Sequence, residues 1–143
     1  SRIQCFSDHH AVSHNVLRDG GDATIVAYGM MVGKALDAAE TLAKEGVECD
    51  VIDLRTLSPI DMETVLESVE NTGRLVVVDE ANPRCSIATD VSAQVAQQAF
   101  KSLKAQIEMV TAPHTPVPFL PTLEDLYIPS AEQIADAVRK THN

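Results

Sequence analysis

The fold is decided by residues 48–78, which read ECDVIDLRTLSPIDMETVLESVENTGRLVVV. Two β-prone runs, 48–54 and 74–78, flank a segment whose apolar residues follow helical spacing, namely Met62, Val65, Leu66 and Val69. Ser58 is expected to cap the start of this helix, and Gly73 marks its end. The run at 74–78, which is apolar from Leu75 onward, is typical of a central parallel strand, so the stretch predicts a β-α-β unit.

The rest of the chain continues this alternation. Residues 15–28 hold two short β-prone runs around a Gly-rich turn, which predicts a hairpin and an antiparallel first pairing. Amphipathic helices are expected at 32–44 and 86–103, a strand at 106–111, and a closing helix from Ser130. This order predicts an α/β fold with three α/β/α layers, in which a mostly parallel sheet lies between helices.

Residues 110–129, VTAPHTPVPFLPTLEDLYIP, contain five of the seven prolines of the chain. Because proline fixes φ and lacks an N–H donor, the segment is expected to form a stiff extended arm without regular structure. An exposed apolar arm indicates a contact with a partner subunit. For His114 alone, a solvated loop histidine is the favoured interpretation and the subunit contact is the other one. The residues expected at the subunit contact are His114, Pro116, Val117, Pro118, Phe119 and Tyr127.

The composition excludes several classes of function. A formal net charge of −10 and a pI near 4.7 would repel nucleic acid and anionic lipid, and the absence of Trp leaves little surface on which bases can stack. No apolar run is long enough to span a bilayer, and no signal-peptide pattern is present, so we expect a cytoplasmic protein without a nucleic-acid or membrane partner. Three widely spaced cysteines indicate reduced thiols.

A glycine-rich turn follows the expected strand that ends near Tyr28. It reads Gly29-Met-Met-Val-Gly33-Lys34-Ala35. A phosphate-binding loop needs four residues between its glycines and a Ser or Thr after the Lys, so the spacing does not match. Gly29 is instead expected to form a tight turn between strand and helix.

Two carboxylates, Asp79 and Glu80, follow the strand at 74–78 and should lie at the carboxyl edge of the sheet, where open α/β sheets bind ligands. Acid or base catalysis is one interpretation. The favoured one is a structural ion pair between Glu80 and Arg55 at the end of a neighbouring strand. Cys85 stands near a helix start, which can lower a thiol pKa, but an ordinary thiol is the favoured interpretation.

Residues 1–14 show no hydrophobic period and are expected to be a leader or a linker remnant, so the folded domain is 15–143. Four leader residues have a spacing that would suit a metal ion, namely Cys5, His9, His10 and His14. We expect no more than adventitious metal binding from them. The chain has no G-x-S-x-G or H-E-x-x-H motif and no nucleophile, base and orienting residue in a recognisable set. No catalytic, cofactor-binding or metal-binding residue is therefore expected.

Two motifs carry a family resemblance: D-L-R-T-L-x-P-x-D from Asp53 to Asp61, and the P-x-P-F arm that ends in L-E-D-x-Y-I-P. With them, residues 17–140 resemble the C-terminal domain of the beta subunit of thiamine-diphosphate-dependent 2-oxo acid dehydrogenases, which has the transketolase C-terminal domain fold. Within the family, the segments ANPRCSIATDVSA and TAPHTPVPF are most similar to acetoin dehydrogenase beta subunits. The resemblance implies a five-stranded, mostly parallel sheet whose first strand is antiparallel.

The resemblance also implies where the chemistry occurs. In this family thiamine diphosphate and magnesium lie between the alpha subunit and the N-terminal domain of the beta subunit, so this chain is expected to bind no cofactor and to be inactive alone. The implied partners are the alpha subunit and a second beta subunit in an α2β2 tetramer, and a lipoyl acyltransferase core. For docking of that core, Lys104 stands where pyruvate-type members often have an Asp, and Asn143 supplies a terminal carboxylate.

Two alternatives stay open from the sequence. The first is the matching domain of a transketolase or deoxyxylulose-phosphate synthase. The second, from another class, is a freestanding α/β module that binds a small molecule in the crevice near Arg55 and Glu80.

Overall fold

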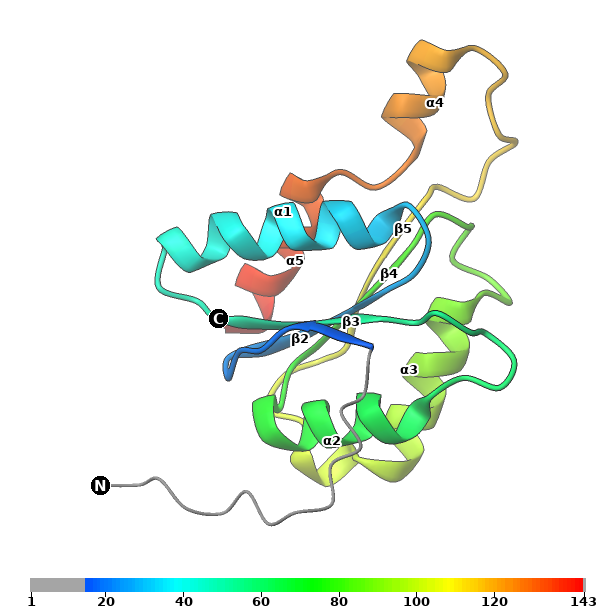
Figure 1. Cartoon of the computed structure of the whole chain (residues 1–143). Helices are drawn as coiled ribbons and strands as arrows, with labels where there is room; N and C mark the ends of the chain where they lie inside the picture. Colours follow the sequence, from blue (N-terminus) through cyan, green and yellow to red (C-terminus); the bar gives the residue numbers. More distant parts are fainter. Residues whose placement is uncertain (1–14, 143) are drawn as a thin grey trace.

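The computed structural model describes residues 15–142 and shows a five-stranded sheet between two layers of helices (Figure 1). The strands are β1 (Val16–Arg18), β2 (Ala23–Ala27), β3 (Cys49–Asp53), β4 (Leu75–Asp79) and β5 (Glu108–Thr111). The helices are α1 (Met31–Lys44), α2 (Met62–Thr72), α3 (Ile87–Gln98), the 3-10 turn η1 (Phe100–Ser102), α4 (Pro121–Tyr127) and α5 (Ala131–His142). The three-layer α/β/α prediction is confirmed.

The strand order in the sheet is β1-β3-β2-β4-β5. β2 pairs in parallel with both β3 and β4, and β5 pairs in parallel with β4. Only β1 is antiparallel, and it pairs with β3. The mostly parallel sheet with an antiparallel first strand is therefore as expected.

The predicted hairpin between the first two strands is wrong, because β1 and β2 lie on opposite sides of β3. The connecting turn passes over the start of β3, and the backbone N–H of Gly20 donates to Asp50 Oδ1 at 2.5 Å. A Cβ on Gly20 would lie 2.5 Å from the backbone nitrogen of Cys49, which is closer than real Cβ contacts come. The glycine thus permits a close crossing of two backbones rather than a tight reversal.

Alternate residues of the sheet face two separate cores, as the period of a strand requires. The core under α1 and α5 contains Ile25, Val51 and Val76, whereas the core under α2 and α3 contains Val26 and Ile52. All five side chains are fully buried. Both faces of the sheet are covered by helices, which explains why β2 and β4 are buried along their whole length.

A chain of buried hydroxyls ties α2 to the sheet. Thr24 Oγ1 lies 2.7 Å from Ser68 Oγ and 2.8 Å from Thr72 Oγ1, and Ser68 donates to the carboxylate of Asp50. Because that carboxylate accepts the Ser68 proton, Thr24 donates to Ser68. The Thr72 hydroxyl lies within reach of both Thr24 and the carbonyl oxygen of Arg74, at 3.2 Å, as acceptors for its proton. The polar groups under α2 are therefore hydrogen-bonded, as burial requires.

The start of α2 differs from the prediction. Asp61, not Ser58, is the N-cap, and its Oδ1 accepts from the backbone N–H of Thr64 at 3.2 Å. Burial would raise the pKa of Asp61, but the hydrogen bonds from Thr64 and Asn15 outweigh it and lower the pKa. Ser58 belongs instead to a turn closed by a bridge between Leu57 and Ile60.

The end of α2 agrees with the prediction, whereas the end of α3 does not. α2 stops at Gly73, which has a φ of +75° and so takes the left-handed conformation that glycine favours. The long helix expected over 86–103 is shorter, because α3 ends at Gln98 and a separate turn, η1, follows.

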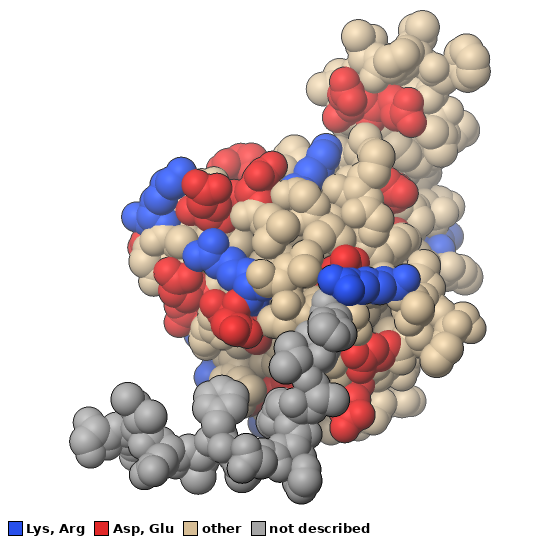
Figure 2. Space-filling model, viewed as in Figure 1, with Lys and Arg blue, Asp and Glu red and all other residues tan. Residues whose placement is uncertain are grey.

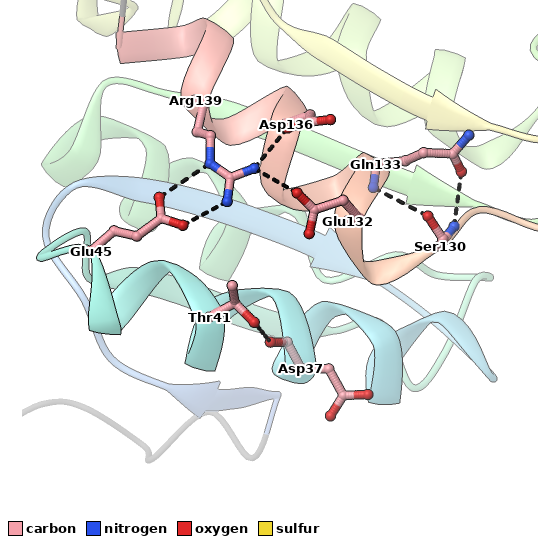
Figure 3. Close-up of polar contacts among 8 residues, drawn as sticks. All are labelled: Asp37, Thr41, Glu45, Ser130, Glu132, Gln133, Asp136 and Arg139. Atoms are coloured by element: carbon pink, nitrogen blue, oxygen red, sulfur yellow. Dashed lines mark hydrogen bonds and ion pairs between the residues drawn. The ribbon is translucent and has the colours of Figure 1, made fainter.

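The last helix, α5, is fixed to the end of α1 by one arginine (Figure 3). The guanidinium of Arg139 contacts Glu45 at 2.6 Å, Glu132 at 3.0 Å and Asp136 at 2.7 Å. These hydrogen bonds, that of Glu45 first, raise the pKa of Arg139, and the same contact lowers the pKa of Glu45. At its start, Ser130 and Gln133 exchange the two bonds of the predicted capping box.

Within residues 15–142, no helix combines the length and the apolar character needed to cross a membrane.

Candidate interaction site at the carboxyl edge of the sheet

The segment after β5 leaves the body of the domain at the carboxyl edge of the sheet and carries α4 away from it (Figure 1). We call residues 112–129 the arm. The prediction that residues 110–129 lack regular structure is wrong in two parts, since 110 and 111 belong to β5 and 121–127 form α4. Pro121 begins this helix, at the position where a missing N–H costs nothing. The remainder of the arm has no helix or strand, as expected.

The arm exposes large apolar side chains. Phe119 is 99% exposed and Leu126 is 83% exposed, which is far more than burial in a domain core allows. Figure 2 shows the projecting lobe as mostly uncharged surface with one acidic patch. The exposed apolar residues of the arm are Val117, Phe119, Leu120, Leu123 and Leu126. Because apolar groups of this size are costly to keep in water, the arm is a candidate interaction surface.

Tyr127 closes the arm on itself. Its hydroxyl lies 3.2 Å from the carbonyl oxygen of Pro113 and 3.1 Å from that of Thr115, so it donates a shared hydrogen bond to the two carbonyls. The side chain is half-buried. Among the arm residues expected at the subunit contact, Tyr127 therefore holds the shape of the arm, whereas Phe119 presents its whole side chain to solvent.

The other predicted arm residues fall into two groups. His114, Pro116 and Val117 are exposed, and Pro118 is half-buried. Sequence reasoning missed Leu123 and Leu126, which α4 places on the surface three residues apart, the spacing that puts side chains on one helical face. Periodicity within 121–127 was the signal that could have identified them.

The base of the arm adjoins a buried carboxylate at the same edge. Asp79, at the end of β4, is fully buried and accepts from Tyr28 Oη at 2.6 Å and from the backbone N–H groups of Ala81 and Ala88 at 2.8 and 3.2 Å. Burial and the bond to Asp79 raise the pKa of Tyr28 above its ordinary value. Since both carboxylate oxygens are occupied, Asp79 joins β2, β4 and the first turn of α3 rather than facing a ligand.

The predicted ion pair between Arg55 and Glu80 is not formed. Arg55 Nε lies 3.7 Å from Asp53 Oδ2, and no ion pair joins it to Glu80 within the part of the chain that the structure describes. The sheet order gives the reason, because β2 lies between β3 and β4 and so separates the two strand ends by two strand spacings, roughly 9–10 Å. Glu80 itself is exposed.

Neither described cysteine forms a binding site. Cys49 is fully buried in the core under α1, and burial raises the pKa of its thiol to about 12. Cys85 is exposed and takes a φ of +50° just before the N-cap of α3. Gly29 has a φ of +57° between β2 and α1, in agreement with the predicted strand-to-helix turn.

Lys104 has a local structural contact. Its Nζ donates to the carbonyl oxygen of Thr72 at 3.1 Å, and its backbone N–H donates to that of Gly73 at 2.8 Å, so it satisfies the end of α2. The second predicted docking residue, Asn143, lies outside the described residues. The same holds for the leader 1–14 and its possible metal ligands Cys5, His9, His10 and His14.

The described residues do not fit a magnesium and thiamine diphosphate site. They contain no group of three or more His, Cys, Asp or Glu side chains placed to hold a metal ion. The buried carboxylate at the sheet edge, Asp79, already accepts three hydrogen bonds. That this chain alone binds no cofactor stays a prediction.

Comparison with known protein families identifies the domain. Residues 13–134 match the family model described as transketolase, C-terminal domain. The chain belongs to this family. The fold agrees, since the chain of a solved structure described as a split gene transketolase, an inactive beta4 tetramer, superimposes with a TM-score of 0.76 at 32% identity over 88% of this chain and 40% of that one.

Curated relatives of this family member are beta subunits. The chain is 76% identical over 127 residues to the beta subunit of acetoin:2,6-dichlorophenolindophenol oxidoreductase of Cupriavidus necator, covering 89% of this chain and 38% of the relative. It is 51% identical over 84% of its length to the same subunit of Bacillus subtilis, of which it covers 35%. It is 42% identical over 85% of its length to the beta subunit of the pyruvate dehydrogenase E1 component of Rhizobium meliloti, of which it covers 26%. The chain thus spans less than two-fifths of these relatives.

Proposed function

We propose that this chain is the C-terminal domain of the beta subunit of a thiamine-diphosphate-dependent dehydrogenase of the acetoin-cleaving type, and that it serves in assembly and docking. The observation that carries the proposal is the 76% identity over 127 residues to an acetoin oxidoreductase beta subunit. The lower identity of 42% to a pyruvate dehydrogenase beta subunit favours acetoin over pyruvate as the substrate of the whole enzyme. The 32% identity to a split gene transketolase makes the transketolase alternative the weaker one.

In this proposal the reaction occurs outside this chain. Thiamine diphosphate and magnesium belong to the full enzyme, and the acyl group passes to a lipoyl acyltransferase. The chain alone is inactive, which is supported by the lack of a fitting ligand set in the described residues. It works in the cytoplasm together with an alpha subunit and a second beta subunit.

The arm is proposed as the surface that contacts a second subunit in an α2β2 assembly. The support is its exposed apolar set, centred on Phe119 at 99% exposure, since aromatic anchors of this kind dominate protein interfaces. The split gene transketolase of 32% identity is described as a beta4 tetramer, which supports a contact between beta subunits. His114 and Pro116 are placed at the rim of the contact, and Tyr127 holds the arm in shape.

Docking of the acyltransferase core is proposed at Lys104 and at the C-terminal Asn143. Lys104 is exposed, and α5 is held in place by Arg74, whose Nε donates to the carbonyl oxygen of Thr141 at 2.9 Å. Because the ammonium of Lys104 also satisfies the end of α2, replacing it with Asp would lose a helix cap as well as reverse a charge.

The proposal is tested on the assembled enzyme, made from the full-length beta subunit and its alpha subunit. We expect reduction of 2,6-dichlorophenolindophenol that depends on acetoin, thiamine diphosphate and magnesium, and a slower reaction with pyruvate. Transfer between sugar phosphates in place of acetoin oxidation would contradict the proposal and favour a transketolase. Activity of the isolated chain would refute its assignment as a non-catalytic domain.

A further inference from the structure

β5 forms an open edge of the sheet. It pairs with β4 on one side, and within residues 15–142 no strand pairs with its other side. In an edge strand, alternate N–H and C=O groups point away from the neighbouring strand and have no partner in the sheet. β5 therefore offers a row of backbone donors and acceptors to which another strand can bind.

The two edges of the sheet differ in how they are protected. β1, at the far edge, has three residues, and its register with β3 is irregular between Val16 and Arg18. Such an irregularity hinders the addition of a further strand. β5 has four residues in a continuous register and contains no Pro, Lys or Arg, and its Met109 is 41% exposed. Its single charged residue, Glu108, is the first of the strand, so most of β5 lacks the usual protection against edge pairing.

The surface beside this edge is locally balanced in charge. A groove of about 510 Å³ lies between β5 and α5, and its charged lining residues are Glu108, Asp136, Arg139 and Lys140. Asp136 lies on the side of α5 that faces away from α1 (Figure 3). The net charge of −10 repels a second copy of the chain, but this lining contains two acidic and two basic residues and so can face an identical surface.

A second copy fits this edge with its last helix as well as with its strand. α5 packs over both β4 and β5, so it lies above the space between these two strands. If two β5 strands pair in antiparallel fashion around a two-fold axis, the two α5 helices lie about two strand spacings apart, which is roughly 9–10 Å. Packed helices have axes about 8–10 Å apart, and the groove lining includes Ala137, whose small side chain permits a close approach.

We propose that the open edge of β5 binds the β5 strand of a second copy of this chain, in an antiparallel pairing that joins the two sheets and packs the two α5 helices together. The inference rests on the proposed contact between beta subunits and adds the surface that forms it. The arm continues directly from Thr111, so a copy bound at this edge also lies beside the base of the arm. The edge and the arm then belong to one interface.

A charge on the open strand tests the pairing in the assembled enzyme with the full-length beta subunit. Met109→Lys places a cation close to its counterpart in the second copy and should raise the dissociation constant of the beta-beta contact at least about tenfold. Leu17→Lys is the matched control, because Leu17 is also 41% exposed and lies in β1 at the other edge. Sedimentation over a range of concentrations gives both constants. Equal constants for the two variants would overturn the proposal.

Hydrogen exchange of the unmodified enzyme is a second measurement, which does not depend on the folding of a variant. Pairing should protect all the amides of 109–111 at concentrations where the beta subunits are associated. After dilution below the dissociation constant, alternate amides of this strand should exchange faster, because they face solvent again. Alternate amides that exchange rapidly at every concentration would show that the edge stays open and would overturn the pairing.

Phe119→Asp, measured in the same way, separates this inference from the proposed function. If both Phe119→Asp and Met109→Lys weaken the association, the edge and the arm form one interface as proposed. If only Phe119→Asp weakens it, the arm contact stands and the pairing of β5 is overturned. If only Met109→Lys weakens it, the pairing stands and the assignment of the arm fails. If the beta subunits of the parent enzyme do not contact each other, the proposed contact fails, and with it the second copy as the occupant.

Discussion

Replacing Phe119 with Asp is the sharpest test of the arm. The side chain is 99% exposed, so its loss should change the free energy of unfolding of the domain by less than about 0.5 kcal/mol. If a partner subunit covers it, the ring buries on the order of 150–250 Å², which corresponds to roughly 4–6 kcal/mol of gross transfer free energy. Replacing a comparable aromatic anchor with alanine typically costs about 2–4 kcal/mol of binding free energy. The charge of an aspartate buried at the contact would increase this cost.

We therefore expect Phe119→Asp to raise the dissociation constant of self-association at least about 30-fold with an unchanged melting temperature. Sedimentation equilibrium over a range of concentrations gives the constant, and thermal unfolding gives the stability. Met30→Asp is the matched control, because Met30 is 64% exposed at the N-cap of α1, where Asp is a favoured residue. Identical association of both variants and the parent, or a parent that stays monomeric at high concentration, would refute the assignment of the arm.

Three other predictions concern the fold and the arm. Gly20→Ala should destabilise the domain by about 2–3 kcal/mol in denaturant unfolding, because a Cβ there meets the backbone of β3. Gly21→Ala is the control and should be neutral, because a Cβ there has nothing within 4 Å. Similar free energies of unfolding for both variants would contradict the crossing. Tyr127→Phe should weaken self-association with little effect on unfolding, since it frees two carbonyls of the arm. Asp61 has a lowered folded pKa, so its contribution to stability is present above its unfolded pKa and is lost as pH falls through the folded value. Asp61→Asn keeps a good cap and should flatten the acid side of the stability profile, and an unchanged profile would count against this role.

The layers of the fold were predictable because they depend on local pattern. A strand covered on both faces is mostly apolar, and residues 75–78 satisfy this, so β4 was identified from its own residues. The same holds for α1 and α5, whose apolar faces are read at helical spacing.

The pairing of β1 could not be predicted in this way. A Gly-rich turn fits a reversal and a crossing equally well. The choice depends on β3, whose Asp50 contacts Gly20 although the two residues are 30 positions apart in the sequence. The cap of α2 was similarly ambiguous, since Ser58 and Asp61 are both good caps, and only the turn around Ile60 selects Asp61. A nonlocal contact therefore decided the first error, and the geometry of a local turn decided the second.

The candidate site also has features that the local sequence predicts and features that depend on contacts between distant residues. Exposure of the arm followed from its prolines, because a segment that cannot join a ladder or a long helix remains outside the core. The inward role of Tyr127 did not follow, since it depends on the carbonyls of Pro113 and Thr115 being brought beside it by α4. The failure of the Arg55 and Glu80 pair came from strand order, which periodicity does not encode.

The two proposed contacts, the arm and Lys104, lie at opposite ends of β5, since the arm follows Thr111 and Lys104 precedes Glu108. Because helices cover both faces of the sheet, the ends of the strands are places where a partner can reach this domain without displacing core contacts. Under the proposed function, a second subunit bound at Phe119 and an acyltransferase bound at Lys104 would not exclude each other. It follows that the effects of changes at the arm and at Lys104 should be additive, as expected for separate sites that share no partner.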